Sequence, residues 1–282
     1  MSKSLGTGMN PLAAIDAYGA DATRYGLMKM ASSQDVRFSE GAIEEGRKLA
    51  NKLWNVARLI LLASEGSEPE ERPRTLEERW ILARLSQAQR EVERLLDEFD
   101  FSHLVDELYH LTFDDFCDWY AEAVKARLYE GDSDARATAV AALERLLKLL
   151  HPAMPHVTEE IWTSLPARES RLIVAPWPEA GDDTEADALA AVQQAAVTFR
   201  RSGVAPRLEG EERRIFEAVV RPRPGAGDGN AAAEIKRLQQ EIARAEGMLA
   251  NERFVQNAPA KVVEAEREKL ARYQRELDAL SG

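Results

Sequence analysis

The sequence predicts a mainly α-helical protein in which a helical bundle is followed by an antiparallel coiled-coil hairpin. Three observations support this fold class. Residues 40–63 and 76–99 place apolar side chains at the three- and four-residue steps of amphipathic helices. Aromatic residues recur at helical spacing between residues 113 and 120. Residues 235–280 repeat the same apolar steps on both sides of Asn257-Ala258-Pro259, as two helices do when they pair along one seam.

Length, composition and charge limit what the chain can do. It has 282 residues, of which 45% are hydrophobic, which is enough for one sizeable core. The formal net charge of −12 argues against indiscriminate binding of nucleic acid, so any RNA contact must use local basic patches. The single cysteine, Cys117, excludes an internal disulfide and fits a reducing compartment. We expect a cytoplasmic protein with no membrane span.

The four histidines do not predict a metal site, because the cysteine partners and the ligand spacing of a zinc site are absent. His151 and His156 stand on either side of two prolines, and we interpret them as packing or capping residues.

The first eleven residues form a short polar stretch. Lys3 lies between Ser2 and Ser4, and Gly6 and Gly8 loosen the backbone that follows. Such a lysine can reach the charge that develops on a leaving pyrophosphate once its loop has closed. On these residues alone, a flexible amino terminus is the simpler interpretation.

Residues 12–38 predict a short helix, a turn at Tyr18-Gly19, a second helix from Asp21 and an extended piece at residues 35–38. Asp21 and Arg24 fit a helix cap and a surface arginine as well as they fit a hinge.

Residues 40–63 predict a long helix with two distinct faces. One broad arc is apolar and consists of Ile43, Leu49, Ala50, Leu53, Trp54, Ala57, Ile60 and Leu61. The opposite arc is basic and amide-bearing, with Arg47, Lys48, Asn51, Lys52, Asn55 and Arg58. Acidic residues are confined to the start of the helix, where its dipole favours them. This arc can donate hydrogen bonds to phosphate and sugar oxygens, although an ordinary solvated face remains the alternative.

Three further helices are predicted between residues 75 and 150. Thr75-Leu76-Glu77-Glu78 is a capping box that opens the first of them. Its buried seam is predicted to comprise Ile81, Leu85, Ala88, Val92, Leu95 and Phe99. A helix from Ser102 should carry the aromatic cluster into the core. The acidic residues of that helix, Asp114, Asp115, Asp118 and Glu122, are interpreted as solvated surface, because the glycine-containing loop of a calcium site is missing.

A break at Gly131 starts the last of these three helices, and Pro152 and Pro155 make a tight turn into a further helix. Residues 173–178 are expected to be extended and residues 184–201 to form an amphipathic helix. The Arg-, Pro- and Gly-rich stretch at 203–230 is expected to be a reduced or partly disordered linker.

The last fifty residues predict two helices, each a few heptads long, that pair antiparallel as a hairpin. Their basic and acidic residues balance, so this arm repels RNA least, and Arg244 and Arg253 are candidate contacts. On periodicity alone, a homodimerisation coiled coil is the favoured interpretation.

Several runs resemble class I aminoacyl-tRNA synthetases, and among them the valine family. Ser2-Lys3-Ser4 resembles the KMSKS signature, and residues 11–24 resemble the run that follows it in the valine, isoleucine and leucine enzymes. Residues 51–55, 116–120 and 151–162 also resemble runs of these helical domains. Residues 251–264 resemble the loop of the carboxy-terminal arm of the valine enzymes, an ending that the isoleucine and leucine enzymes lack.

The resemblance implies ATP-dependent ligation of valine to tRNA, with Mg²⁺ accompanying ATP in the intact enzyme. It implies that Lys3 is catalytic and that Met1, Ser2, Lys3 and Ser4 form the ATP-binding loop. The implied tRNA contacts are Arg47, Lys48, Asn51, Lys52, Asn55, Arg58, Arg244 and Arg253. The motif's leading lysine would precede Met1, so we expect the nucleotide-binding fold in a missing amino-terminal portion, with which this chain acts as a monomer.

The implied domains are a loop and hinge at residues 1–38, an anticodon-binding helical bundle at 39–180, a helix and linker at 181–230, and a tRNA-binding arm at 231–282. Two alternatives remain open. The chain could be a stand-alone tRNA-binding module without catalysis, or a helical scaffold that dimerises through the arm.

Overall fold

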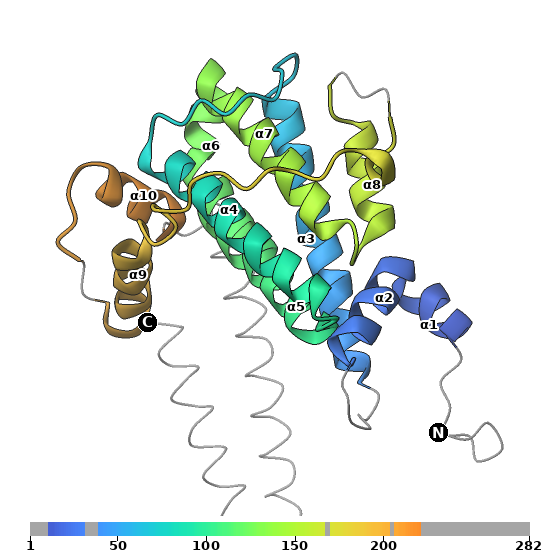
Figure 1. Ribbon diagram of the computed structural model, residues 1–282. Coiled ribbons are helices and arrows are strands. Elements are labelled where there is room, and N and C mark those ends of the chain that lie inside the picture. Colours follow the sequence, from blue (N-terminus) through green and yellow to red (C-terminus); the bar gives the residue numbers. More distant parts are fainter. Residues whose placement is uncertain (1–10, 32–38, 167–169, 204–205, 221–282) are drawn as a thin grey trace, which may run out of the picture. The chain divides into compact units, whose positions relative to one another are not determined.

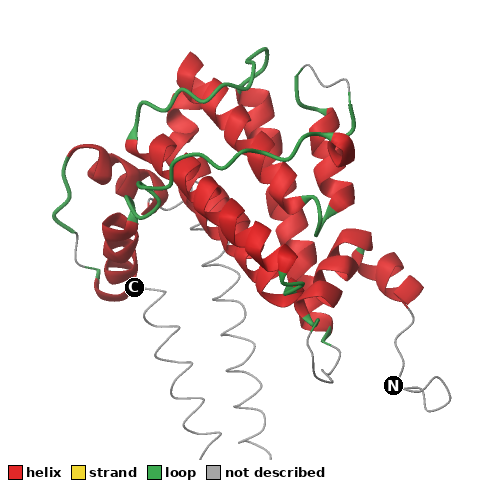
Figure 2. Ribbon diagram, viewed as in Figure 1, coloured by secondary structure: helices red, strands yellow, loops and turns green. Residues whose placement is uncertain are grey.

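The computed structural model describes residues 11–31, 39–166, 170–203 and 206–220, and every regular element in these ranges is helical (Figures 1 and 2). The chain divides into two compact units, Met1–Val220 and Arg221–Gly282. The loop around Lys3, the extended piece at 35–38 and the coiled-coil hairpin at 231–282 lie outside the described residues.

The first described elements are α1 (Pro11–Tyr18), α2 (Ala20–Lys29) and α3 (Glu40–Ala63). Gly19 separates α1 from α2 at φ 92°, a left-handed conformation that glycine adopts without strain. Helices α2 and α3 cross where Gly26 faces Ile43 and Gly46 faces Tyr25. The two helices, the turn between α1 and α2 and the length of α3 agree with the sequence prediction.

Helix α4 (Leu76–Asp97) opens with the predicted capping box of Thr75 and Glu78. The carboxylate of Glu78 accepts hydrogen bonds from the backbone N–H groups of Arg74 (2.8 Å) and Thr75 (3.0 Å). The predicted seam is buried from Ile81 to Leu95 but is wrong at Phe99. The helix ends before Phe99, which adopts φ 58° and is 76% exposed.

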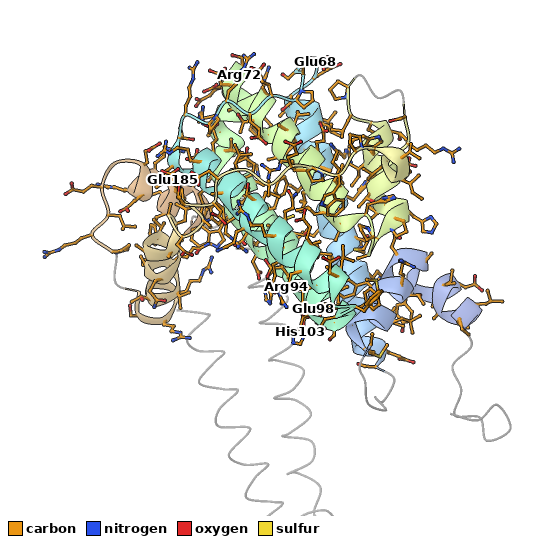
Figure 3. The ribbon with its side chains drawn as sticks, viewed as in Figure 1. Glu68, Arg72, Arg94, Glu98, His103 and Glu185 are labelled. Carbon is orange, nitrogen blue, oxygen red and sulfur yellow. The ribbon has the colours of Figure 1, made fainter. Side chains whose placement is uncertain are left out.

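Helix α5 (Phe101–Tyr109) follows the turn at Phe99. Arg94, Glu98 and His103 lie near one another where α4 ends and α5 begins (Figure 3).

The aromatic cluster lies in a π-helical segment, η2 (His110–Tyr120), which joins α5 to α6 (Ala121–Glu130). Phe116 and Tyr120 are fully buried, as predicted. The interpretation of the acidic residues as solvated surface is incomplete. Asp115 pairs with Arg84 of α4 (3.0 Å) and Asp118 pairs with Lys52 of α3 (2.7 Å), so both tie η2 to neighbouring helices.

Helix α7 (Ser133–Leu150) is the most buried helix among the described elements, and α3, α4, α6 and α8 (Pro155–Thr163) pack around it. It follows Gly131, at φ 85°, and is capped by Asp132, as the predicted break requires. Residues 172–174 form one 3₁₀ turn, η3 (Leu172–Val174), within the piece predicted to be extended.

Helix α9 (Ala190–Ser202) begins later than predicted and packs on α10 (Gly210–Val220), where Phe199 and Phe216 meet edge to face. The expectation of an irregular linker is wrong for residues 210–220. Burial of Ile215 and Phe216 against the bundle stabilises α10.

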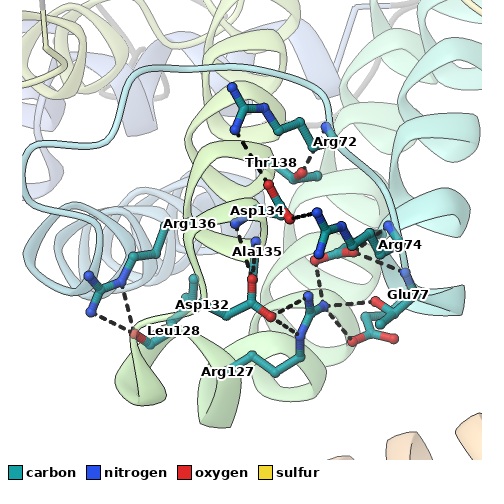
Figure 4. Close-up of polar contacts among 12 residues, drawn as sticks. Arg72, Arg74, Glu77, Arg127, Leu128, Asp132, Asp134, Ala135, Arg136 and Thr138 are labelled. Atoms are coloured by element: carbon teal, nitrogen blue, oxygen red, sulfur yellow. Dashed lines mark hydrogen bonds and ion pairs between the residues drawn. The ribbon is translucent and has the colours of Figure 1, made fainter.

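An ion-pair network around buried carboxylates joins α4, α6 and α10, and Figure 4 shows its part around Arg127 and Glu77. Glu77 and Glu78 at the start of α4 are fully buried. Arg127 of α6 lies 2.5 Å from Glu78 and 2.7 Å from Asp132, and Arg214 of α10 lies 2.6 Å from Glu77. This network fastens α10 to the bundle.

Candidate nucleic-acid interface

Six of the predicted tRNA-binding residues lie on α3 and are described. The buried face of this helix is formed by Ile43, Leu49, Leu53, Ala57 and Ile60. Because these residues hold α3 against the bundle, its opposite face is turned outward. The exposed members of the predicted basic arc are Arg47, Lys48, Asn51, Asn55 and Arg58.

The sixth residue, Lys52, is only 20% exposed and is committed to internal contacts. Its Nζ lies 2.7 Å from the carboxylate of Asp118 and 3.1 Å from the ring centroid of Phe113. Arg47 is exposed but pairs with Glu44 at 2.6 Å. Among the described residues, no carboxylate forms an ion pair with Lys48 or Arg58. The positive charge available to a ligand on this face is therefore concentrated on these two side chains.

Two hollows flank Arg58. The first, which we call the Arg58 groove, has a cavity volume of about 490 Å³ and runs from α3 to the ends of α6 and α7. Its lining residues are Asn55, Arg58, Leu59, Leu62, Ala63, Leu128, Tyr129 and Arg136. Leu62 is 67% exposed and Tyr129 is 65% exposed, so the groove presents large apolar groups beside two arginines.

The second hollow, which we call the Trp54 groove, has a volume of about 200 Å³ and lies between α3 and α8. Its lining residues are Trp54, Ala57, Arg58, Leu61, Leu62, Ile161 and Ser164. Trp54 belongs to the predicted apolar arc of α3, but its side chain is 43% exposed. Helix periodicity gives the direction of a side chain and not whether another helix covers it.

Arginines beside exposed aromatic rings suit a nucleic acid with unstacked bases. Aromatic side chains and guanidinium planes stack on bases, and arginine also donates to phosphates. Sequence reasoning missed Tyr129 and Arg136, which come from α6 and α7. Their placement beside α3 depends on tertiary packing, which no local pattern encodes.

Helix α8, which lines the Trp54 groove, is also held by α2. The carboxylate of Asp21 accepts hydrogen bonds from the backbone N–H groups of His156 (3.0 Å) and Val157 (2.6 Å) at the start of α8. Arg24 donates to the Pro152 carbonyl oxygen (3.1 and 2.9 Å) just after α7. Asp21 therefore caps a different helix from its own, and Arg24 binds the turn that precedes it.

We expect Asp21→Ala to lower the free energy of unfolding by about 1 kcal/mol, the usual cost of losing an N-cap acceptor. Two N–H groups of α8 would lose their acceptor, so amide hydrogen exchange at Val157 should become faster. Asp21→Asn keeps an acceptor oxygen and should lose less. Unchanged exchange in Asp21→Ala would show that water replaces the cap at no cost.

Other titratable groups show no arrangement for catalysis in the part of the chain that the structure describes. Burial raises the pKa of the Cys117 thiol to about 12, so the sulfur stays protonated and unreactive. Burial lowers the pKa of His151, whose Nδ1 lies 2.8 Å from the Thr158 hydroxyl. Within the described ranges, no three His, Cys, Asp or Glu side chains gather as metal ligands, and no helix is long and apolar enough to cross a membrane.

Two family models match the sequence. Residues 78–212 match the anticodon-binding domain of tRNA ligase. Residues 232–282 match the valyl tRNA synthetase tRNA binding arm. The first match includes Tyr129 and Arg136 of the Arg58 groove and begins within α4.

Full-length relatives are similar over the whole chain. The valine–tRNA ligase of Enterococcus faecalis is 34% identical over 347 residues, which cover 99% of this chain and 39% of that protein. The valine–tRNA ligase of Thermus thermophilus is 35% identical, in an alignment that covers 100% of this chain and 38% of that protein. The chain thus spans about two fifths of the length of these curated relatives. Because the aligned lengths exceed 282 residues, the relatives also carry segments with no counterpart here.

A solved structure shares the fold of the bundle. The LeuRS chain in the crystal structure of a ternary LeuRS–tRNA–LeuAMS complex from Agrobacterium radiobacter superposes with a TM-score of 0.52 at 23% sequence identity. The similarity covers 64% of this chain and 22% of that one.

Proposed function

This chain belongs to the valine–tRNA ligase family, and from that membership we propose that it supplies the tRNA-binding part of an enzyme that ligates valine to its tRNA at the expense of ATP. The observation that carries the proposal is the surface around Arg58. It joins positive charge that has no carboxylate partner in the described part of the chain to exposed aromatic rings, in a protein whose net charge is −12. An acidic protein that binds RNA needs such a local patch.

The proposed ligand of the Arg58 and Trp54 grooves is the anticodon loop of tRNA. Loop bases are unstacked and can enter the two hollows beside Trp54 and Tyr129, while Lys48 and Arg58 neutralise phosphates. Asn51 and Asn55 are placed to donate hydrogen bonds along the same face. Lys52 and Arg47 act less directly, since their charges are already paired.

The remaining assignments rest on the sequence. Lys3 would stabilise charge on the phosphates of ATP–Mg²⁺, with Met1, Ser2 and Ser4 shaping the loop. Arg244 and Arg253 of the arm would contact the tRNA body. The proposed division is a loop and hinge at 1–38, the bundle at 39–180, a connecting segment at 181–230 and the arm at 231–282. The enzyme would act in the cytoplasm as a monomer, together with a nucleotide-binding portion.

The test is tRNA binding by the isolated 282-residue chain, measured by fluorescence anisotropy at several salt concentrations. Valine tRNA and its isolated anticodon stem–loop should both bind, and both affinities should fall as salt rises. Arg58→Ala should weaken both about tenfold, a loss of about 1.4 kcal/mol.

Arg94→Ala is the matched control. It removes the same charge from an exposed helix surface, but Arg94 pairs with Glu91 (2.6 Å) and Glu98 (2.5 Å), so RNA affinity should stay the same. No binding of either RNA at low salt would refute the proposal. The stand-alone module without catalysis is the second candidate. Valylation by this chain together with a separately expressed nucleotide-binding portion would rule it out.

A further inference from the structure

Three arginines of the α9–α10 region differ from most other arginines in the described part of the chain. Arg200 and Arg201 lie in the last turn of α9, and Arg207 lies in the segment before α10. All three are exposed, and none forms an ion pair with a carboxylate of the described residues. We call these three residues the α9 arginine cluster.

Helix α9 is also unusual in its own composition. It is the one α-helix in the described part of the chain that contains no Asp or Glu. Its exposed side chains are neutral or basic, and include Gln194 and Thr198 as hydrogen-bonding groups. By contrast, the exposed Arg90 and Arg94 of α4 are neutralised by carboxylates of the same or a neighbouring element. Among the described residues, no carboxylate therefore neutralises the charge at the end of α9.

The position of α9 separates this surface from the Trp54 groove. Helix α10 fastens α9 to the bundle through the Phe199–Phe216 contact and through the ion pair of Arg214 with Glu77. In Figure 1, α9 and α10 lie on the opposite side of the bundle from α8, which forms one wall of the Trp54 groove. Helix α9 and the Trp54 groove therefore lie on different sides of the bundle.

We propose that the α9 arginine cluster binds the phosphate backbone of tRNA at a second place, outside the anticodon loop. The inference rests on the proposed function, because it takes tRNA as the ligand. Guanidinium groups with amide and hydroxyl neighbours, and no exposed aromatic ring among them, suit phosphate and sugar oxygens rather than bases. The contact positions the RNA without reading its sequence.

The test compares Arg200→Ala/Arg201→Ala with a matched double variant, Arg90→Ala/Arg94→Ala, in the intact 282-residue chain. Both variants remove two exposed arginines, so they change the net charge equally. Binding is measured by anisotropy for full-length valine tRNA and for its anticodon stem–loop. The α9 variant should bind full-length tRNA about tenfold more weakly and the stem–loop as tightly as the wild type does.

The salt dependence gives a second readout. Loss of two phosphate contacts should reduce the slope of log affinity against log salt by about 1.4 to 1.8 for full-length tRNA. Arg200→Lys/Arg201→Lys keeps both charges and should retain most of the slope. The control variant should leave both slopes unchanged.

Each other outcome has a definite meaning. Equal affinities of the α9 and control variants for full-length tRNA would overturn the second contact. Equal weakening for tRNA and stem–loop would also overturn it, because the cluster would then belong to the anticodon side. If polyglutamate competes with tRNA for the wild type but not for the α9 variant, the cluster is a site for an acidic protein instead. If the wild type binds neither RNA, the proposed function itself fails.

Discussion

Replacing Arg127 with alanine should lower the free energy of unfolding by about 3–5 kcal/mol, the usual cost of removing one partner from a buried ion pair. Arg127 donates to Glu78 (2.5 Å), to the Thr75 hydroxyl (3.0 Å) and to Asp132 (2.7 Å). Glu77 and Glu78 have no solvent exposure, so the alanine variant would leave negative charge at the start of α4 without its main neutralising group. A thermal melt or a urea titration measures the loss.

Two further variants show whether the loss of stability in Arg127→Ala comes from the burial of its partners or from the loss of charge alone. Arg94→Ala removes an arginine that also pairs with two carboxylates, but Arg94 is exposed, and such pairs contribute about 0–1 kcal/mol. Arg214→Ala removes the partner that α10 supplies to Glu77, so it should release α10 before the bundle melts. A loss below 1 kcal/mol in Arg127→Ala would show that water enters the site and solvates the two glutamates.

This network also bears on the α9 arginine cluster. Helix α9 reaches the bundle through α10, and α10 is held there by Arg214 and by the burial of Ile215 and Phe216. Arg214→Ala should therefore weaken the binding of full-length tRNA by displacing α9, although the residues of the α9 arginine cluster are unchanged.

Helix positions were predictable from the sequence wherever a repeating apolar pattern ended at a clear signal. The capping box at Thr75, the break at Gly131 and the proline turn at Pro155 each mark a helix boundary that the structure confirms. Each signal acts through local backbone geometry, so it needs no knowledge of the neighbours. Residues 210–220 carry no such signal, and α10 forms because Ile215 and Phe216 find a buried surface.

The candidate site was only partly predictable, for the same reason. The basic arc of α3 followed from its period, and five of its six members are exposed. Lys52 is neutralised by Asp118, which lies 66 positions later in the chain. Trp54 is exposed because α8 covers only part of the apolar arc, and Tyr129 joins the groove from another helix. Contacts between distant segments decide all three cases.

Gly26→Ala should destabilise the docking of α2 on α3 by about 2 kcal/mol, within the usual cost of overpacking. A Cβ atom at this position would lie 2.6 Å from Cγ1 of Ile43 and 2.9 Å from its backbone N and Cα atoms. The side chain of Ile43 can turn away, but the backbone of α3 cannot move without disturbing the core beneath it. The helix preference of alanine over glycine, about 1 kcal/mol, offsets only part of this cost.

The effect of Gly26→Ala should extend from α2 to α8. Helix α2 carries Asp21 and Arg24, which hold α8 and the turn before it, and α2 is preceded by α1 and then by the residues around Lys3. Hydrogen exchange in α2 and at Val157 of α8 should therefore become faster together in Gly26→Ala. Gly41→Ala is the matched control, because its added Cβ would meet only the Ser39 hydroxyl at 3.4 Å, and its exchange should match the wild type. If Gly26→Ala is as stable as Gly41→Ala, α2 and α3 accommodate the added methyl group at no cost, and the close crossing does not hold α2 in place.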